Sequence, residues 1–264
     1  TRQSRPAHRS FRLPLDRLGV LSPPKRLTSA ATCECIVASE RLPIAHYAVP
    51  SRALFCPAGG VRSYPPREEL ANRLTHGLGA ALSVAGLVLL LVFSCRHGTA
   101  WHIVSTAIFG ATLVLLYTSS TLYHSFRGER TRRLLQKFDH AAIFLLIAGS
   151  YTPFMLVTLR GRWGWSLFGI VWGLAAIGVS LKFWFAGRFR LGSTLIYLGM
   201  GWLVMVAIKP LIAALPAGGL RLLVAGGLCY TGGAVFYLWK RLPYQHAIWH
   251  LFVLGGSACH WAAI

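Results

Sequence analysis

The chain has 264 residues, of which 55% are hydrophobic and 13% are charged, and its formal net charge is +20. A soluble domain carries roughly 25% charged residues, so this composition argues against a soluble globular protein and for a membrane protein. In a soluble chain the positive charge would suggest nucleic acid. Here the basic residues lie in the N-terminal part and between apolar segments, as membrane topology requires. We therefore expect contact with membrane lipids and no nucleic-acid partner.

Residues 1–66 differ from the rest of the chain. They are rich in Arg, Pro and Ser, have no hydrophobic periodicity and contain no apolar stretch of the signal-peptide kind. We expect either a disordered basic tail or sequence upstream of the natural start. Residues 67–264 are predicted to form one membrane domain.

Long apolar runs alternate with short basic connectors from Arg67 onward. A helix needs about 20 mostly apolar residues to cross roughly 30 Å of hydrocarbon. The runs that meet this length lie at 76–95, 101–122, 138–158, 163–185, 192–209, 219–239 and 246–264. They predict an all-α polytopic membrane protein with seven transmembrane helices in a bundle. The last run ends at Ile264 without a polar flank, so we expect the natural C-terminus to lie beyond it.

The connectors predict the orientation of the chain in the membrane. Those after the second, fourth and sixth runs hold nine Lys and Arg residues, whereas the opposite connectors hold four. Cytoplasmic loops carry the excess of positive charge. We therefore expect a cytoplasmic N-terminus and an outside C-terminus.

Polar residues gather at the cytoplasmic ends of three runs. The last run opens with "YQHAIWH", which places His246 and His250 one helical turn apart and on one face. The second run closes with "SSTLYH", which brings Ser120 and His124 to the same depth, and "FDHAAIF" brings Asp139 there from the third. An ionisable group inside a span is costly and indicates function.

Three imidazoles and a carboxylate at one depth are the donors that a catalytic zinc ion uses, since such sites keep a fourth position for water. We predict that His124, His246 and His250 bind zinc. Asp139 would orient or deprotonate the water, and Ser120 would supply a hydrogen bond. The alternative for each histidine alone is a packed core residue.

Two further groups are open to interpretation. Glu69, Asn72 and His76 follow helical spacing in "EELANRLTHGLG", either as an amphipathic first turn or as a second polar shell around the metal. His140 projects about 100° away from its neighbour Asp139, and is expected to be a packing or interface residue.

Four segments together resemble the bacterial haemolysin III family, which is grouped with progestin and adiponectin receptors and more distantly with alkaline ceramidases. They are "EELANRLTHG", "SSTLYHS", "FDHAAIFLLIAGSYTPF" and "LPYQHAIWHLFVLGGSACH". The resemblance covers roughly residues 67–264. It implies a seven-helix protein of the bacterial plasma membrane with a cytoplasmic N-terminus. It also implies a zinc ion held by His124, His246 and His250, with Asp139 and Ser120 as partners.

Three functions are compatible with these features. The first is zinc-dependent hydrolysis of a lipid-like amide or ester inside the bilayer. The second is a cytolytic or pore-forming protein with structural zinc, and the third is a membrane-fluidity sensor without turnover. Polarity concentrated at one depth favours a localised site over a pore. The sequence leaves open whether the zinc is catalytic or structural, and it leaves the oligomeric state open.

Overall fold

The structure, a computed structural model, describes residues 64–185 and 189–264. Every secondary-structure element in these two ranges is a helix, so the all-α prediction is confirmed for this part of the chain. The expectations for the tail concern residues that lie almost entirely outside the described ranges.

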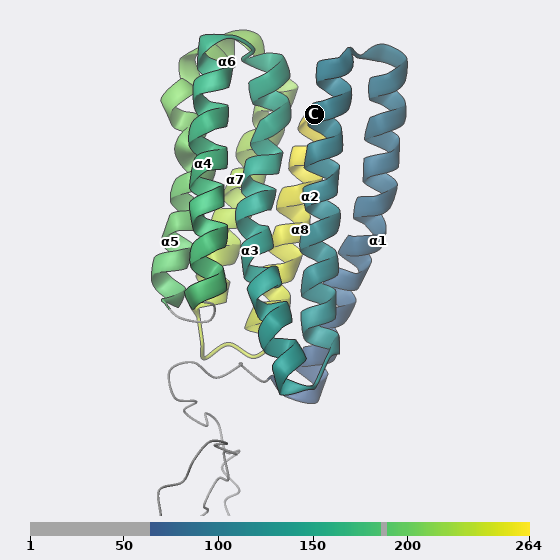
Figure 1. The fold of residues 1–264 in the computed structure, drawn as a ribbon, viewed down its shortest axis with the longest axis vertical. Coiled ribbons are helices and arrows are strands. Elements are labelled where there is room, and N and C mark those ends of the chain that lie inside the picture. The colour runs from purple at the N-terminus through teal and green to yellow at the C-terminus, as the bar shows by residue number, and fades with distance from the viewer. Residues whose placement is uncertain (1–63, 186–188) are drawn as a thin grey trace, which may run out of the picture. The chain divides into compact units, whose positions relative to one another are not determined.

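The helices follow one another with short connectors (Figure 1). The continuous helices are α1 (Pro66–His97), α2 (Ala100–Ser125), α4 (Arg162–Phe185), α7 (Ala217–Leu238) and α8 (Gln245–Ala263). Two further rods are composite. The first is α3 (Glu129–Pro153) with the π-helical turn η1 (Phe154–Thr158), and the second is α5 (Arg190–Gly201), the 3₁₀ segment η2 (Trp202–Ala207) and α6 (Ile208–Ala214).

Both composite rods have a local cause. Pro153 has no N–H to donate to the helical ladder. Directly after it the backbone widens into the π-helical turn, in which the N–H of Leu159 donates to the carbonyl of Phe154 at 2.7 Å. In the second rod the Tyr151 hydroxyl lies 2.6 Å from the Gly201 carbonyl and 2.8 Å from the Val204 N–H. Such partners satisfy backbone groups that an irregular helix leaves open within a membrane.

Six helical segments of the described ranges are long and apolar enough to cross a membrane. They are Pro66–His97, Ala100–Ser125, Glu129–Thr158, Arg162–Trp184, Arg190–Ala214 and Ala217–Leu238. The predicted run at 246–264 does form a helix, α8, but its 19 residues do not belong to this set. Its three histidines lower its hydropathy. A helical membrane bundle therefore fits, while the count of seven spans stays a prediction.

The helices form a ring in which α8 lies between the α1–α2 pair and α7 (Figure 1). Helix α1 packs on α2 and α8, α2 on α3, α3 on α5, α5 on α7, and α7 on α8, while α4 packs on α3. The α7–α8 contact depends on small residues. A Cβ atom at Gly226 would meet the His260 ring, and one at Gly256 would meet the Tyr230 ring at 2.8 Å.

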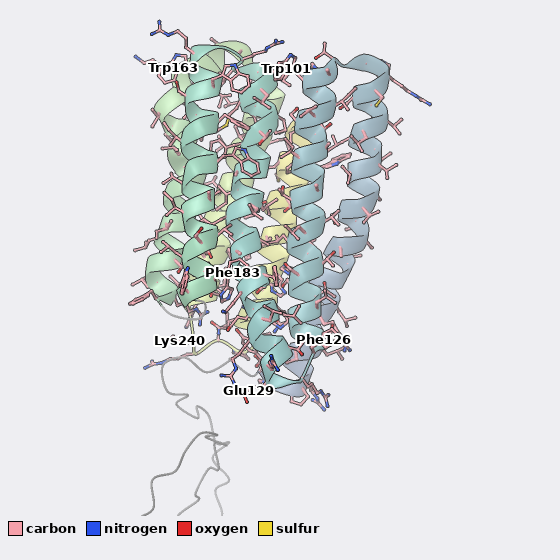
Figure 2. The ribbon with its side chains drawn as sticks, in the orientation of Figure 1. Trp101, Phe126, Glu129, Trp163, Phe183 and Lys240 are labelled. Carbon is pink, nitrogen blue, oxygen red and sulfur yellow. The ribbon has the colours of Figure 1, made fainter. Side chains whose placement is uncertain are left out.

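The outer faces of the helices are apolar and several buried positions are polar. Leu78 and Val88 on α1 and Leu228 on α7 are exposed, whereas Asn72 and Ser105 are fully buried. This distribution suits a lipid environment rather than water. Trp101 and Trp163 lie at one end of the bundle, and Glu129 and Lys240 lie at the other (Figure 2).

Candidate metal centre

Three histidines from two helices meet inside the bundle. His124 comes from the last turn of α2, and His246 and His250 come from the first turns of α8. One ligand nitrogen of each lies within 4.8 Å of the others, and all three side chains are buried. The ring centre of His246 is 5.0 Å from that of His124 and 4.5 Å from that of His250. The structure thus brings together the three residues that the sequence placed at one depth.

The start of α8 sets the position of its two histidines. Tyr244 adopts a left-handed backbone conformation, with φ 55°, directly before the helix. The first helical hydrogen bond runs from the Ile248 N–H to the Tyr244 carbonyl at 2.9 Å. Because His246 and His250 are four residues apart, they then project from the same face of α8.

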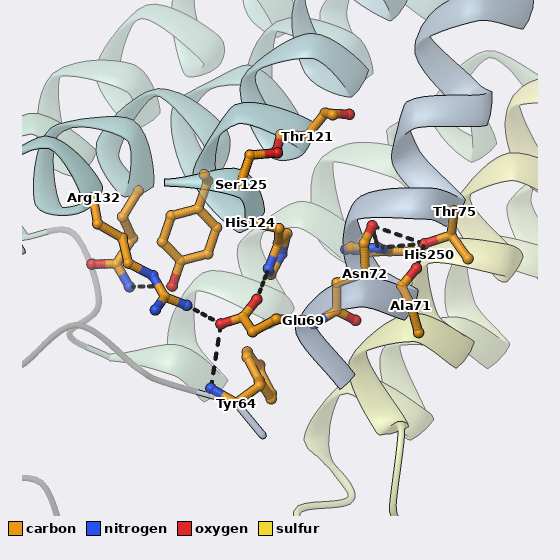
Figure 3. A network of polar contacts seen from close by, with 12 residues as sticks. Tyr64, Glu69, Ala71, Asn72, Thr75, Thr121, His124, Ser125, Arg132 and His250 are labelled. Carbon is orange, nitrogen blue, oxygen red and sulfur yellow. Dashed lines mark hydrogen bonds and ion pairs between the residues drawn. The ribbon is translucent and has the colours of Figure 1, made fainter. Parts of the chain in front are cut away.

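His124 is held by a carboxylate from α1. Its Nδ1 lies 2.6 Å from a Glu69 oxygen, while the second Glu69 oxygen contacts Arg132 and accepts the Tyr64 N–H at 3.3 Å (Figure 3). An imidazole that donates from Nδ1 to a carboxylate presents its lone pair on Nε2. The Nε2 atom of His124 is buried and has no hydrogen-bond partner in the structure. Such a nitrogen is available to a metal.

His250 is held by a different pair of groups. Its Nδ1 lies 3.0 Å from the Thr75 hydroxyl and 3.2 Å from the Asn72 carbonyl. The Thr75 hydroxyl donates to backbone, since it lies 2.9 Å from the Ala71 carbonyl and 3.0 Å from that of Asn72. The proton in the contact with His250 therefore belongs to Nδ1, which leaves Nε2 as the ligand nitrogen. His76 stacks on the same ring at 3.4 Å between centres.

The donor set suits a transition metal, and zinc in particular. Neutral imidazoles are ligands for Zn²⁺, with Zn–N distances of about 2.0–2.1 Å. Two of the three rings are already fixed in the tautomer that exposes Nε2. The buried, unpartnered His124 Nε2 is costly unless something binds it. The residues present therefore fit a three-histidine metal site.

Asp139 and Ser120 lie beside the histidines. Both are buried, and both line a cavity of about 210 Å³ that His246 and His250 also line. The Asp139 carboxyl lies close to the Ser120 side chain and to His124. A carboxylate and a hydroxyl thus face the same space as two of the three imidazoles.

Helix α1 supplies more of the site than the sequence indicated. Glu69 and His76 contact a histidine of the cluster through their side chains, and Asn72 does so through its backbone carbonyl. Thr75 and Arg132 were missed. Thr75 lies three residues after Asn72, and this helical spacing would have suggested that it belongs to the same polar face. Arg132 was counted only among the basic connector residues that predict the orientation in the membrane.

His140 was expected to be a packing or interface residue, and it lines the same cavity as Asp139. The cavity follows the surface of α3 far enough to include both neighbours, so the angle of about 100° between them does not separate them.

Comparison with known proteins identifies the family. Residues 65–261 match the family described as haemolysin-III related. The chain belongs to this family. It is 52% identical over 192 residues to the hemolysin-3 homolog of Bacillus subtilis strain 168, covering 73% of this chain and 90% of the relative. Hemolysin-3 of Bacillus cereus is also 52% identical over 192 residues, covering 73% and 88%.

A more distant relative of this haemolysin-III protein occurs in animals. The human monocyte to macrophage differentiation factor is 29% identical over 214 residues, covering 79% of this chain and 87% of the relative. No solved structure matches the chain. The family and the apolar helices together establish an integral membrane protein.

Proposed function

We propose that this haemolysin-III protein is a seven-helix membrane hydrolase that uses zinc to cleave lipid-like amides or esters. His124, His246 and His250 would hold the ion. The observation that carries the proposal is the cavity of about 210 Å³, which joins His246 and His250 to an interior lined largely by apolar and aromatic side chains. A structural metal site has no need of such a space.

The cavity has the size and chemistry for an organic ligand. A single water molecule needs only about 10–15 Å³ of cavity. Leu146, Trp249 and Val253 supply apolar wall, and Asp139 and Ser120 supply polar groups beside the histidines. Binding sites for small molecules combine apolar walls with a few placed polar groups in this way.

Each polar residue has a distinct task in the proposed reaction. When bound, zinc would supply the Lewis acid that activates a water molecule and polarises a carbonyl. The Asp139 carboxylate would accept the proton of the attacking water and return it to the leaving group. The Ser120 hydroxyl would donate a hydrogen bond to the substrate. Glu69 and Thr75 would keep the Nε2 atoms of His124 and His250 directed at the ion.

We further propose that the protein lies in a bacterial plasma membrane, with α8 as the seventh span and the histidines towards the cytoplasm. The distribution of basic residues supports this orientation. The Bacillus relatives support the bacterial membrane.

A cytolytic function is the second candidate, because the relatives carry the name hemolysin. In that case, or if the protein senses membrane fluidity, the zinc would be structural. The test starts with the zinc content of purified wild-type protein and of His250→Ala, followed by lipid-amide hydrolysis. His97→Ala, at an exposed end of α1, is the matched control.

About one zinc per chain, lost together with hydrolysis in His250→Ala and retained in His97→Ala, supports the hydrolase. Zinc without turnover on a broad lipid panel rejects the hydrolase and favours a structural ion. Absence of zinc after purification in zinc-replete buffer rejects the metal site itself.

A further inference from the structure

A second polar group lines the same cavity, from helices that do not carry the histidines. Lys182 near the end of α4 is only 7% exposed, and its Nζ lies 2.5 Å from the Ser193 hydroxyl and 5.7 Å from the Tyr197 ring centre. Arg190, the first residue of α5, lies with its guanidinium 3.8 Å from the Tyr237 ring centre and bonds the Tyr237 carbonyl. All five of these residues line the cavity.

Lys182 has no carboxylate partner among the described residues. The described part of the chain contains the ion pairs His124–Glu69, Arg132–Glu69 and Arg133–Glu129, none of which involves Lys182. A buried ammonium that is not paired with an anion is costly. The contacts of Lys182 with a hydroxyl and an aromatic ring stabilise it only in part. The cavity wall therefore offers an anion a positive charge that no described side chain neutralises.

His140 connects this cationic group to the proposed metal centre. Its Nδ1 is buried without a hydrogen-bond partner, and its ring lies within electrostatic range of Lys182, Arg190 and His124. Its backbone carbonyl accepts the Tyr197 hydroxyl at 3.0 Å. Asp139 is the residue directly before His140 and lines the same cavity. The cationic group and the reacting groups therefore occupy adjoining parts of one cavity.

The rest of the cavity is suited to a hydrocarbon chain. It extends past Leu198 and Trp202 as far as His260, which lies ten residues beyond His250, or about 15 Å along the axis of α8. His246, His250, the cationic group and the apolar extension thus line one continuous space.

From this arrangement we infer that the cavity binds a single-chain amphiphile whose anionic oxygen group, a carboxylate or phosphate, pairs with Lys182 and Arg190. The inference deepens the proposed function and rests on it for the role of substrate. The substrate class is then an acyl amide or ester that carries the anionic group close to the scissile carbonyl. Lys182 would act as a specificity-determining residue, since it contacts the head group and not the reacting atoms.

The binding test uses ligands that cannot be hydrolysed. Dodecyl phosphate, dodecanoate and the neutral dodecanol are compared by equilibrium dialysis against the full-length protein in a non-ionic detergent with a zinc chelator. The unmodified protein should prefer both anions to dodecanol by at least about tenfold, which corresponds to about 1.4 kcal/mol. Equal binding of the three would overturn the inference without any variant.

Lys182→Gln should lose this preference, Lys182→Arg should retain it, and dodecanol binding should not change in either. Lys209→Gln, an exposed lysine outside the cavity, is the control and should resemble the unmodified protein. Arg190→Gln repeats the test if Lys182→Gln does not fold. Anion binding that survives both substitutions but is lost in His250→Ala would place the anion at the histidines and overturn the inference.

Inorganic phosphate distinguishes a head group from a free anion. Inorganic phosphate, at the concentration at which dodecyl phosphate saturates the protein, should not displace bound dodecyl phosphate. Displacement by inorganic phosphate at that concentration would indicate a site for free phosphate and reject the amphiphile. Failure of hydrolysis with the anion preference intact would reject the proposed enzyme activity while leaving the anionic subsite in place.

Discussion

The Glu69 carboxylate links the proposed metal ligand His124 to Arg132. One of its oxygens holds His124 Nδ1 at 2.6 Å, and Arg132 contacts the other. A carboxylate behind a ligating imidazole fixes its tautomer and raises its basicity. The ion pair with Arg132 in turn keeps Glu69 in the orientation that the histidine requires.

We predict that Glu69→Gln weakens zinc binding by about 10- to 100-fold, measured by competition with a chromophoric chelator. Glu129→Gln, which alters an exposed pair with Arg133, should leave the affinity unchanged. Unchanged zinc affinity in a folded Glu69→Gln protein would show that the carboxylate has no part in the centre.

Thr75 acts on the second ligand in the same way but through a neutral group. Thr75→Val removes the hydroxyl that accepts from His250 and leaves the Asn72 carbonyl as the remaining acceptor. A neutral hydrogen bond contributes about 1 kcal/mol, so zinc affinity should fall by roughly fivefold. Thr75→Ser keeps the hydroxyl and should restore the affinity in the same competition assay. A serine variant as weak as the valine variant would contradict this role.

At the level of elements, the close contact of α7 with α8 positions His246 and His250 of the last helix. A side chain at Gly256 would meet the Tyr230 ring at 2.8 Å, whereas a Cβ at Gly199 would meet nothing within 4 Å. Overpacking of this kind costs about 1–3 kcal/mol. The spacing of these two helices is therefore set by glycine.

Gly256→Ala should lower the thermal unfolding midpoint in detergent and reduce zinc content, because α8 must move away from α7. Gly199→Ala should leave both unchanged. Circular dichroism and metal analysis of the two variants check this. A Gly256→Ala protein as stable as the Gly199→Ala protein would show that the ring of Tyr230 moves aside without cost.

At the scale of the whole molecule, the decisive feature is whether α8 crosses the membrane. In a background whose own cysteines are replaced by serine, Lys240→Cys should be protected from a membrane-impermeant maleimide in intact cells. Ile264→Cys should be labelled, because α8 separates the two positions. The same labelling at both positions would contradict the seventh span.

Much of this arrangement could be predicted from helical periodicity and charge. The four-residue spacing of His246 and His250, the depth of His124 and the basic connectors are local properties that need no knowledge of packing. The contacts of Glu69 and Thr75 could not be derived in this way. They depend on how α1 is rotated against α2 and α8, which is determined by side-chain packing across the bundle.

The sequence by itself determined that the chain is helical and membrane-embedded, because composition and apolar run length suffice for that. It also determined which three histidines share a depth, because the rise of a helix is constant. Only the tertiary structure decided that Asp139 and His140 both face one cavity, and that Lys182 from α4 reaches it as well. These positions depend on the rotation and distance of helices far apart in the chain. Packing of complete side chains determines both, and a linear pattern does not contain that information.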